Sequence, residues 1–238
     1  MDSFKIVISS HIKSYQKIAP LFINSLTRNG LPTEKILLVI GGNETKSEST
    51  FMDCKAVFVN HNSYDHTGLI EILEGKHESE HWFSSHDTCI AGPKFVEFLN
   101  KYKPKKDYVS MTDMGWLNMG LFKKSYLERN KNYILSLKNC SKIRAILSER
   151  VFTRLEDFDY FVPDYNCIRT LENENIYNDD KKRNVINFLP ALKKYATCKK
   201  YLDITLFKKF KVDSGNIVWG NNWEMIFKIE DLYENKFN

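Results

Sequence analysis

The chain has 238 residues, of which 42% are hydrophobic and 27% are charged, and its formal net charge is +5. This balance is typical of a folded globular protein and excludes a disordered or fibrous one, while so small a charge does not by itself indicate nucleic acid. The five cysteines are odd in number and include no Cys-x-x-Cys pair, which argues against a disulfide framework and a zinc knuckle.

Short apolar runs alternate with a helical pattern in the first part of the chain. The runs predict strands over 4–9, 35–40 and 56–59. Between the first two, apolar residues at helical spacing predict a helix that stops at Asn29-Gly30, and Pro20 requires it to begin near Ala19 because an interior proline costs about 3 kcal/mol. Strand, helix and strand in this order form a βαβ unit, in which the strands are parallel.

The next elements lead to a polar strand end. A short helix is predicted over 67–74, and the stretch 81–94 then begins with an extended run that ends at His86 and Asp87. Gly92-Pro93 opens another helical pattern. An acidic residue at the end of a strand is a common way to hold a metal or a phosphate, so Asp87 is the central candidate.

The second half is predicted less regularly. Residues 107–111 predict a strand, and 112–122 a loop that returns to a strand. Apolar residues at helical spacing predict one helix over 141–155 with a buried apolar face. Beyond residue 160 the sequence predicts only short strands, within 201–210 and 217–219.

The ends and the apolar runs carry no targeting signal. The first residues lack the basic start and long apolar stretch of a signal peptide, and no run approaches the roughly 20 apolar residues of a membrane helix. We therefore expect a soluble, cytoplasmic protein without a transmembrane segment.

Nucleotide-binding fingerprints are absent. Neither Gly-x-Gly-x-x-Gly nor a P-loop motif occurs. A nucleotide would therefore depend on side chains, or on a metal, for its phosphates.

The order of these features resembles one enzyme family. VISSHIKSY, ILLVIGGN, the loop over 60–68, SSHDTCIAGPKF and WLNMGLFKKSYL together resemble a GT-A fold glycosyltransferase of the small viral and bacterial type, over about residues 4–157. The resemblance implies an α/β fold with a Rossmann-type mixed, mostly parallel sheet flanked by helices. It also implies a single domain over 1–238, in which 1–110 bind the nucleotide-sugar and 111–238 include the acceptor-binding half. Where the family carries Asp-x-Asp, this chain has His86-Asp87-Thr88-Cys89, with one carboxylate.

The resemblance also implies roles for individual residues. The enzyme would move a hexose or pentose from a nucleotide-diphosphate sugar, expected to be linked to UDP, to a hydroxyl of a glycan or glycoprotein, with inversion. Asp87 would coordinate Mn²⁺ or Mg²⁺ bridging the two phosphates. The remaining donor-binding candidates are Ser9, Ser10, His11, Asn62, Asp65 and His86. The acceptor-facing candidates are Met114, Trp116 and Asn118, and the candidates for the catalytic base are Glu149 and Asp157.

Other functions remain open at the level of sequence. The missing second carboxylate favours an inactive module that binds nucleotide-sugars. A sugar nucleotidyltransferase is a further alternative, although it usually carries a glycine-rich basic loop after the first strand. The basic C-terminal part leaves nucleic-acid binding as a remote option. The spacing of His61 and His66 fits a zinc site, but no cysteine pair accompanies them.

Overall fold

The computed structural model describes residues 4–91, 95–112, 119–148, 151–162 and 207–209. Its strands are β1 (Phe4–His11), β2 (Ile36–Gly41), β3 (Ser47–Phe51), β4 (Cys54–Phe58), β5 (His81–His86), β6 (Cys89–Ala91), β7 (Tyr108–Thr112), β8 (Gly120–Lys123), β9 (Asp159–Val162) and β10 (Phe207–Lys209). Its α-helices are α1 (Tyr15–Arg28), α2 (Thr67–Glu74), α3 (Phe95–Lys101), α4 (Lys124–Arg129), α5 (Lys131–Ser136), α6 (Lys142–Leu147) and α7 (Phe152–Leu155). Two 3₁₀ turns, η1 (Thr33–Lys35) and η2 (Tyr64–His66), complete the described elements.

The fold is α/β. Eight strands form one mixed sheet in the order β3-β4-β2-β1-β5-β8-β7-β9, and β6 and β10 form a second sheet of two strands. The pairs β1–β2, β1–β5, β2–β4 and β7–β9 are parallel, and the other three pairs of the large sheet are antiparallel. The predicted class, a mixed and mostly parallel sheet flanked by helices, is confirmed. The division into halves at residue 110 stays a prediction.

The first βαβ unit forms as predicted. β2 is buried along its whole length and β1 along most of it, because both strands lie in the interior of the sheet and are covered on both faces. Ser9 is level with Val39 of β2 and with His86 of β5. The carboxyl ends of the three strands therefore lie side by side.

Helix α1 begins earlier than predicted. It starts at Tyr15, so that Pro20 lies inside the helix, and the expectation of a start near Ala19 is wrong. The proline costs about 3 kcal/mol through one lost hydrogen bond and the clash of its ring with the preceding turn, whereas burying Leu21 and Phe22 stabilises by roughly 1.5–3 kcal/mol each. The predicted stop is confirmed, since a Schellman motif with Gly30 at φ 83° closes the helix.

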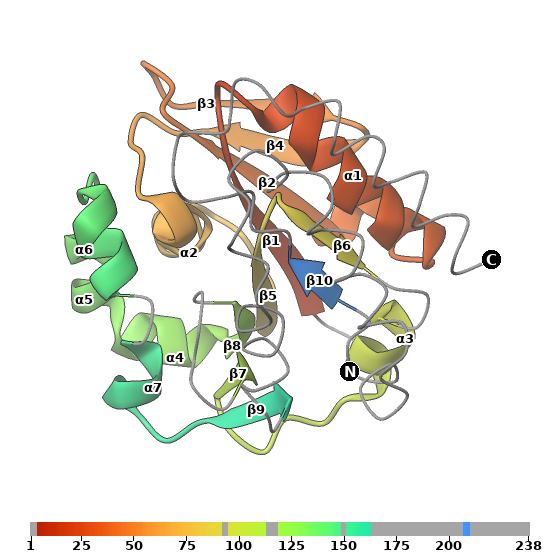
Figure 1. The fold of residues 1–238 in the computed structure, drawn as a ribbon, viewed down its shortest axis with the longest axis vertical. Helices are drawn as coiled ribbons and strands as arrows, with labels where there is room; N and C mark the ends of the chain where they lie inside the picture. Colours follow the sequence, from red (N-terminus) through yellow and green to blue (C-terminus); the bar gives the residue numbers. More distant parts are fainter. Residues whose placement is uncertain (1–3, 92–94, 113–118, 149–150, 163–206, 210–238) are drawn as a thin grey trace, which may run out of the picture.

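Two hydrophobic layers enclose the large sheet. The core on one face contains Ile6 and Ile8 of β1 with residues of α1 and α3. The core on the other face contains Val7 with residues of α2, α4, α5 and α7. Figure 1 shows α1 and α3 on one side of the sheet, and α2 with α4 to α7 on the other.

The predicted long helix over 141–155 is wrong. The chain instead forms the short helices α6 and α7. On α6, Ile143 and Leu147 are 71% and 76% exposed, while Ala145 and Ser148 are buried, so the expected apolar face does not pack as a whole. Among the described residues, no helix is both long and apolar enough to cross a membrane.

Gly120 of β8 lies where the backbones of β7 and β8 approach closely. It pairs with Ser84 of β5 and Ser110 of β7, and a Cβ atom added there would lie 2.2 Å from the carbonyl oxygen of Val109. We expect Gly120→Ala to lower the free energy of unfolding by about 3 kcal/mol, because the two strands must move apart. Urea unfolding followed by circular dichroism measures this change.

Gly30→Ala is the matched control. Gly30 also has positive φ, but nothing lies within 4 Å of an added Cβ atom, so only about 1 kcal/mol of backbone strain is expected. An equal decrease in the free energy of unfolding for the two variants would contradict the close approach at Gly120.

Candidate functional site

The candidate site lies at the carboxyl edge of the large sheet. The parallel strands β1, β2, β4 and β5 all end there and continue into the polar segments 9–11, 41–43, 60–65 and 86–87. Open α/β sheets bind their ligands beyond this edge. The strand register places these carboxyl ends side by side, and residues 10–11, which the sequence prediction placed beyond the first strand, belong to β1.

Asp87 is held at the end of β1. Its backbone N–H donates to the carbonyl of Ser9 at 3.1 Å, which continues the pairing of β5 with β1. The hydroxyl of Ser10 donates to Oδ2 of Asp87 at 2.5 Å. Asp87 is only 3% exposed. Two neighbouring strand ends therefore fix this carboxylate in place.

His86 is paired with a second carboxylate. Nδ1 of His86 lies 2.9 Å from Oδ1 of Asp65, which belongs to η2. An ionised carboxylate only accepts hydrogen bonds, so Asp65 favours the tautomer that carries its proton on Nδ1. The imidazole, which is 8% exposed, is thereby held in one orientation.

Ser9 connects η2 to β1. Its hydroxyl accepts a hydrogen bond from the backbone N–H of Gly68 at 3.0 Å and donates to the carbonyl of Asp65 at 3.4 Å. Ser9 is 5% exposed. Its side chain thus stabilises the loop that carries Asp65.

The helical layer supports the loop over 60–65 from its other side. The backbone N–H of Asn139, a residue with φ 56°, donates to the hydroxyl of Ser63 at 3.0 Å. The side chain of Asn139 accepts from the N–H of Asn62 at 3.3 Å. Nδ1 of His61 lies 2.9 Å from the same hydroxyl of Ser63. Residues far apart in sequence therefore determine the shape of this loop.

His11 lies against the loop that follows β2. A Cβ atom added at Gly42 would lie 2.6 Å from Nε2 of His11, so this approach requires glycine. Burial, with a smaller effect of the Lys13 charge, lowers the pKa of His11. At neutral pH its imidazole is uncharged.

His66 is a site residue that sequence reasoning missed. It is fully buried in η2, and neither ring nitrogen has a hydrogen-bond partner among the described residues. Burial lowers its pKa to about 4, although the charge of Asp65 acts in the opposite direction. In the sequence, only its spacing from His61 drew attention to it, as a zinc ligand rather than as part of the donor site.

The candidates for the catalytic base do not join this group in the described part of the chain. Asp157 lies just before β9, at the opposite edge of the sheet from Asp87. Its side chain is 79% exposed and lies 2.5 Å from Nζ of Lys106. The hydrogen bond from Lys106 lowers the pKa of Asp157. Glu149, Met114, Trp116 and Asn118 lie outside the described residues.

Among the described residues, the donor set does not fit a resident divalent ion. A bound Mg²⁺ or Ca²⁺ ion takes about six or more oxygen ligands. No group of three or more His, Cys, Asp or Glu side chains is placed to hold a metal within the described ranges. Asp87 already accepts from Ser10, and Asp65 is paired with His86. The described residues also do not provide His61 and His66 with the further ligands that a zinc site needs.

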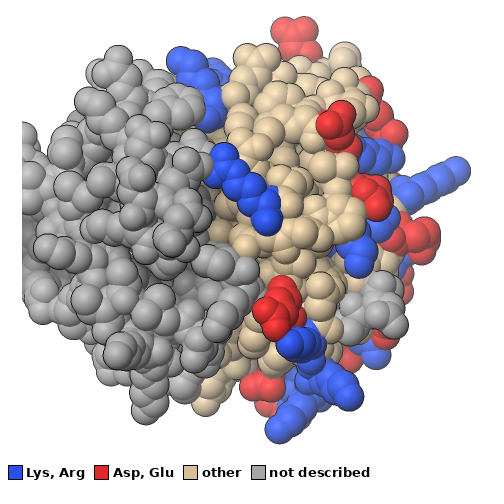
Figure 2. All heavy atoms as spheres, turned by 90° about the vertical axis from the view of Figure 1, so that its right-hand side faces the viewer, with Lys and Arg blue, Asp and Glu red and all other residues tan. Residues whose placement is uncertain are grey.

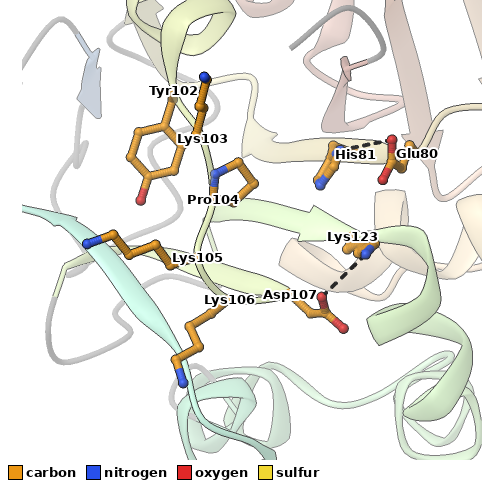
Figure 3. A pocket seen from close by; sticks show the side chains of 9 residues that line it. All are labelled: Glu80, His81, Tyr102, Lys103, Pro104, Lys105, Lys106, Asp107 and Lys123. Atoms are coloured by element: carbon orange, nitrogen blue, oxygen red, sulfur yellow. Dashed lines mark ion pairs between the residues drawn. The ribbon is translucent and has the colours of Figure 1, made fainter.

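A hollow of about 480 Å³ lies at the amino ends of β5 and β7, away from the carboxyl edge, and is lined by several lysines. Figure 3 shows that the ammonium groups of Lys103, Lys105 and Lys106 point away from one another. Lys106 is paired with Asp157, and Lys123 lies 3.7 Å from Asp107. The hollow therefore does not direct its charges at one ligand.

Charge does not mark out a binding surface on the described part of the face that Figure 2 shows. Figure 2 shows Lys and Arg interspersed with Asp and Glu on one side of the molecule, around an area without charged residues. Several of the described charges are paired, such as Lys101 with Glu97. Mixed charge of this kind is typical of an ordinary solvated surface.

Comparisons with known proteins give little further guidance. No model of a known protein family matches the sequence, and no curated protein matches it. Among solved structures 21 chains match, including S. aureus TarS 1–349, with 10% sequence identity, a TM-score of 0.43, and coverage of 88% of this chain and 76% of that chain. At this TM-score the likeness carries no argument about the present chain.

The buried His66 predicts an acid-sensitive fold. A histidine with pKa about 4 in the folded state and 6.5 in the unfolded state binds its proton more readily when unfolded, so stability falls as pH decreases from 6.5 to 4. This one group should cost about 2 kcal/mol at pH 5 relative to pH 8. Urea unfolding of wild type and His66→Met across this range gives the slope of the free energy of unfolding against pH for each protein, and the slope should be smaller for His66→Met. Equal slopes for the two proteins would exclude His66 as the source.

Proposed function

We propose that the protein is a glycosyltransferase that uses a nucleotide-diphosphate sugar, with UDP as the expected nucleotide. The carrying observation is the pair of supported carboxylates, Asp87 with Ser10 and Asp65 with His86, at the carboxyl edge of a mostly parallel sheet. Ligands of α/β sheets bind at this edge. The order of sequence segments, which resembles GT-A glycosyltransferases, supports the same proposal.

In this proposal the loops at the carboxyl edge bind the donor. Segments 9–11 and 60–65 contact the nucleoside, and the charge of Asp87 would attract a divalent ion that enters with the diphosphate of the donor. Because the described side chains do not supply a full set of metal ligands, we propose that any Mn²⁺ or Mg²⁺ requirement comes from the diphosphate of the donor rather than from an ion held by the protein.

The proposal assigns the base to His86 in place of Asp157. Transfer forms a bond between the acceptor oxygen and the anomeric carbon, while the bond from that carbon to the diphosphate breaks. The proton of the acceptor hydroxyl passes to Nε2 of His86, and Asp65 stabilises the imidazolium through Nδ1. A direct displacement of this kind inverts the anomeric configuration. Glu149 stays an alternative base.

Asp87→Asn tests the donor site. The amide keeps an oxygen that accepts from Ser10, so the fold should be retained, whereas the lost charge should lower donor hydrolysis at least 10-fold. Release of UDP from a panel of UDP-sugars, with and without Mn²⁺, measures this. Asp53→Asn, in the exposed turn between β3 and β4, is the matched control and should hydrolyse the donor like wild type. Wild-type rates for Asp87→Asn would overturn the assigned role.

His86→Gln tests the base. General bases contribute typically 10²–10⁴-fold, so kcat of donor hydrolysis should fall by about 100-fold while KM changes little. Asp65→Asn should give a smaller loss in kcat, because the imidazole remains but is no longer held by a carboxylate. Steady-state kinetics distinguish these outcomes. A rise in KM at unchanged kcat would assign His86 to substrate binding instead.

If the wild-type protein binds a nucleotide-sugar tightly but does not cleave the bond between the sugar and the diphosphate, the chain is a binding module rather than an enzyme. Isothermal titration calorimetry beside the hydrolysis assay separates these two functions.

A further inference from the structure

Tyr64 combines two properties that are costly for a tyrosine. Its φ angle is 50°, in the left-handed region that bulky side chains rarely adopt. Its side chain belongs to the few large hydrophobic groups that are exposed, at 38%. Within the described part of the chain, its ring packs against no other aromatic ring and its hydroxyl forms no hydrogen bond. Packing among these residues therefore does not explain a tyrosine at this position.

The surrounding loop holds Tyr64 in this conformation. Its backbone N–H donates to Oδ1 of Asn62 at 3.3 Å, and its carbonyl accepts from the hydroxyl of Thr67 at 2.8 Å. Ser63, the residue before it, is fixed by the backbone N–H of Asn139. Strain that is held by its surroundings in this way is common at ligand clamps.

Tyr64 also lies at the candidate site. The next residue is Asp65, which pairs with His86, and η2 packs against β1 and α6. The loop therefore carries an exposed aromatic ring and a carboxylate on consecutive residues at the ligand-binding edge of the sheet.

We propose that the ring of Tyr64 stacks on the nucleobase of the bound nucleotide. This inference rests on the proposed function and names the residue that recognises the base. Aromatic side chains bind nucleobases by stacking, which tolerates different bases because each has a π-face. The cost of the strained backbone is then offset when the ligand binds.

Tyr64→Asn provides the test, since asparagine adopts the left-handed region more readily than other residues and should keep the loop intact. UDP affinity should fall at least five-fold, which is the lower end of one stacking interaction. The affinity for inorganic diphosphate, which has no base, should not change. Isothermal titration calorimetry of both ligands measures this, and Tyr64→Phe should bind UDP within two-fold of wild type.

Two controls separate a binding role from a structural one. The midpoint of thermal unfolding of Tyr64→Asn should not fall below that of wild type, because strain is relieved. Tyr160→Asn, which changes a similarly exposed tyrosine on β9, should leave UDP binding unchanged.

The outcomes that overturn the inference are distinct from failure of the proposed function. Equal UDP affinity in wild type and Tyr64→Asn would exclude stacking while leaving the glycosyltransferase proposal intact. Parallel losses for UDP and inorganic diphosphate would also exclude stacking, because the base would not be involved. If wild type binds none of UDP, GDP, ADP, CDP and dTDP, the proposed function fails and the role of Tyr64 fails with it.

Discussion

The close packing of α2 on β1 is the constraint on which the candidate site depends. A Cβ atom at Gly68 would lie 2.7 Å from Cγ2 of Val7, so the first turn of α2 lies directly on the strand. The backbone of Gly68 also donates to Ser9, whose hydroxyl reaches the carbonyl of Asp65. These contacts fix η2 at the end of β1, and only there does Asp65 lie beside His86. The pairing of Asp65 with His86 thus depends on the close approach of Gly68 to β1.

The strands and helices that the sequence predicted correctly are those whose position is determined by the burial of apolar side chains. β1, β2 and β4 are rich in apolar residues, and α2 ends next to a glycine. β3 was not recognised because four of its five residues, Ser47 to Thr50, are polar and exposed, and Phe51 alone packs against the core. The single helix over 141–155 failed for the opposite reason. Its apolar spacing is real, but Ile143 and Leu147 are exposed because tertiary packing buries a different face of α6.

The candidate site was predicted as a set of residues but not as a set of contacts. Strand ends in a parallel sheet meet at one edge, so Ser10, Asp65, His86 and Asp87 were correctly expected near one another. The pairing of Asp65 with His86 depends on the register of β1 and β5 and on the turn at η2, which no local pattern encodes. Asp157 was chosen by residue type, and the sequence did not reveal that it precedes β9 at the amino edge of the sheet, opposite the site. The left-handed conformation of Tyr64 is likewise a property of the folded loop.

The strand pair beyond Asp87 has a consequence for how the molecule is made. β6 begins two residues after Asp87, and its partner β10 comes from near the end of the described chain. A nascent chain emerges from the ribosome N-terminus first, so β6 is exposed long before β10 has been synthesised. Until then the backbone groups that β6 offers to β10 must bind water or a chaperone. The two-stranded sheet next to Asp87 therefore forms late, although β6 is synthesised early.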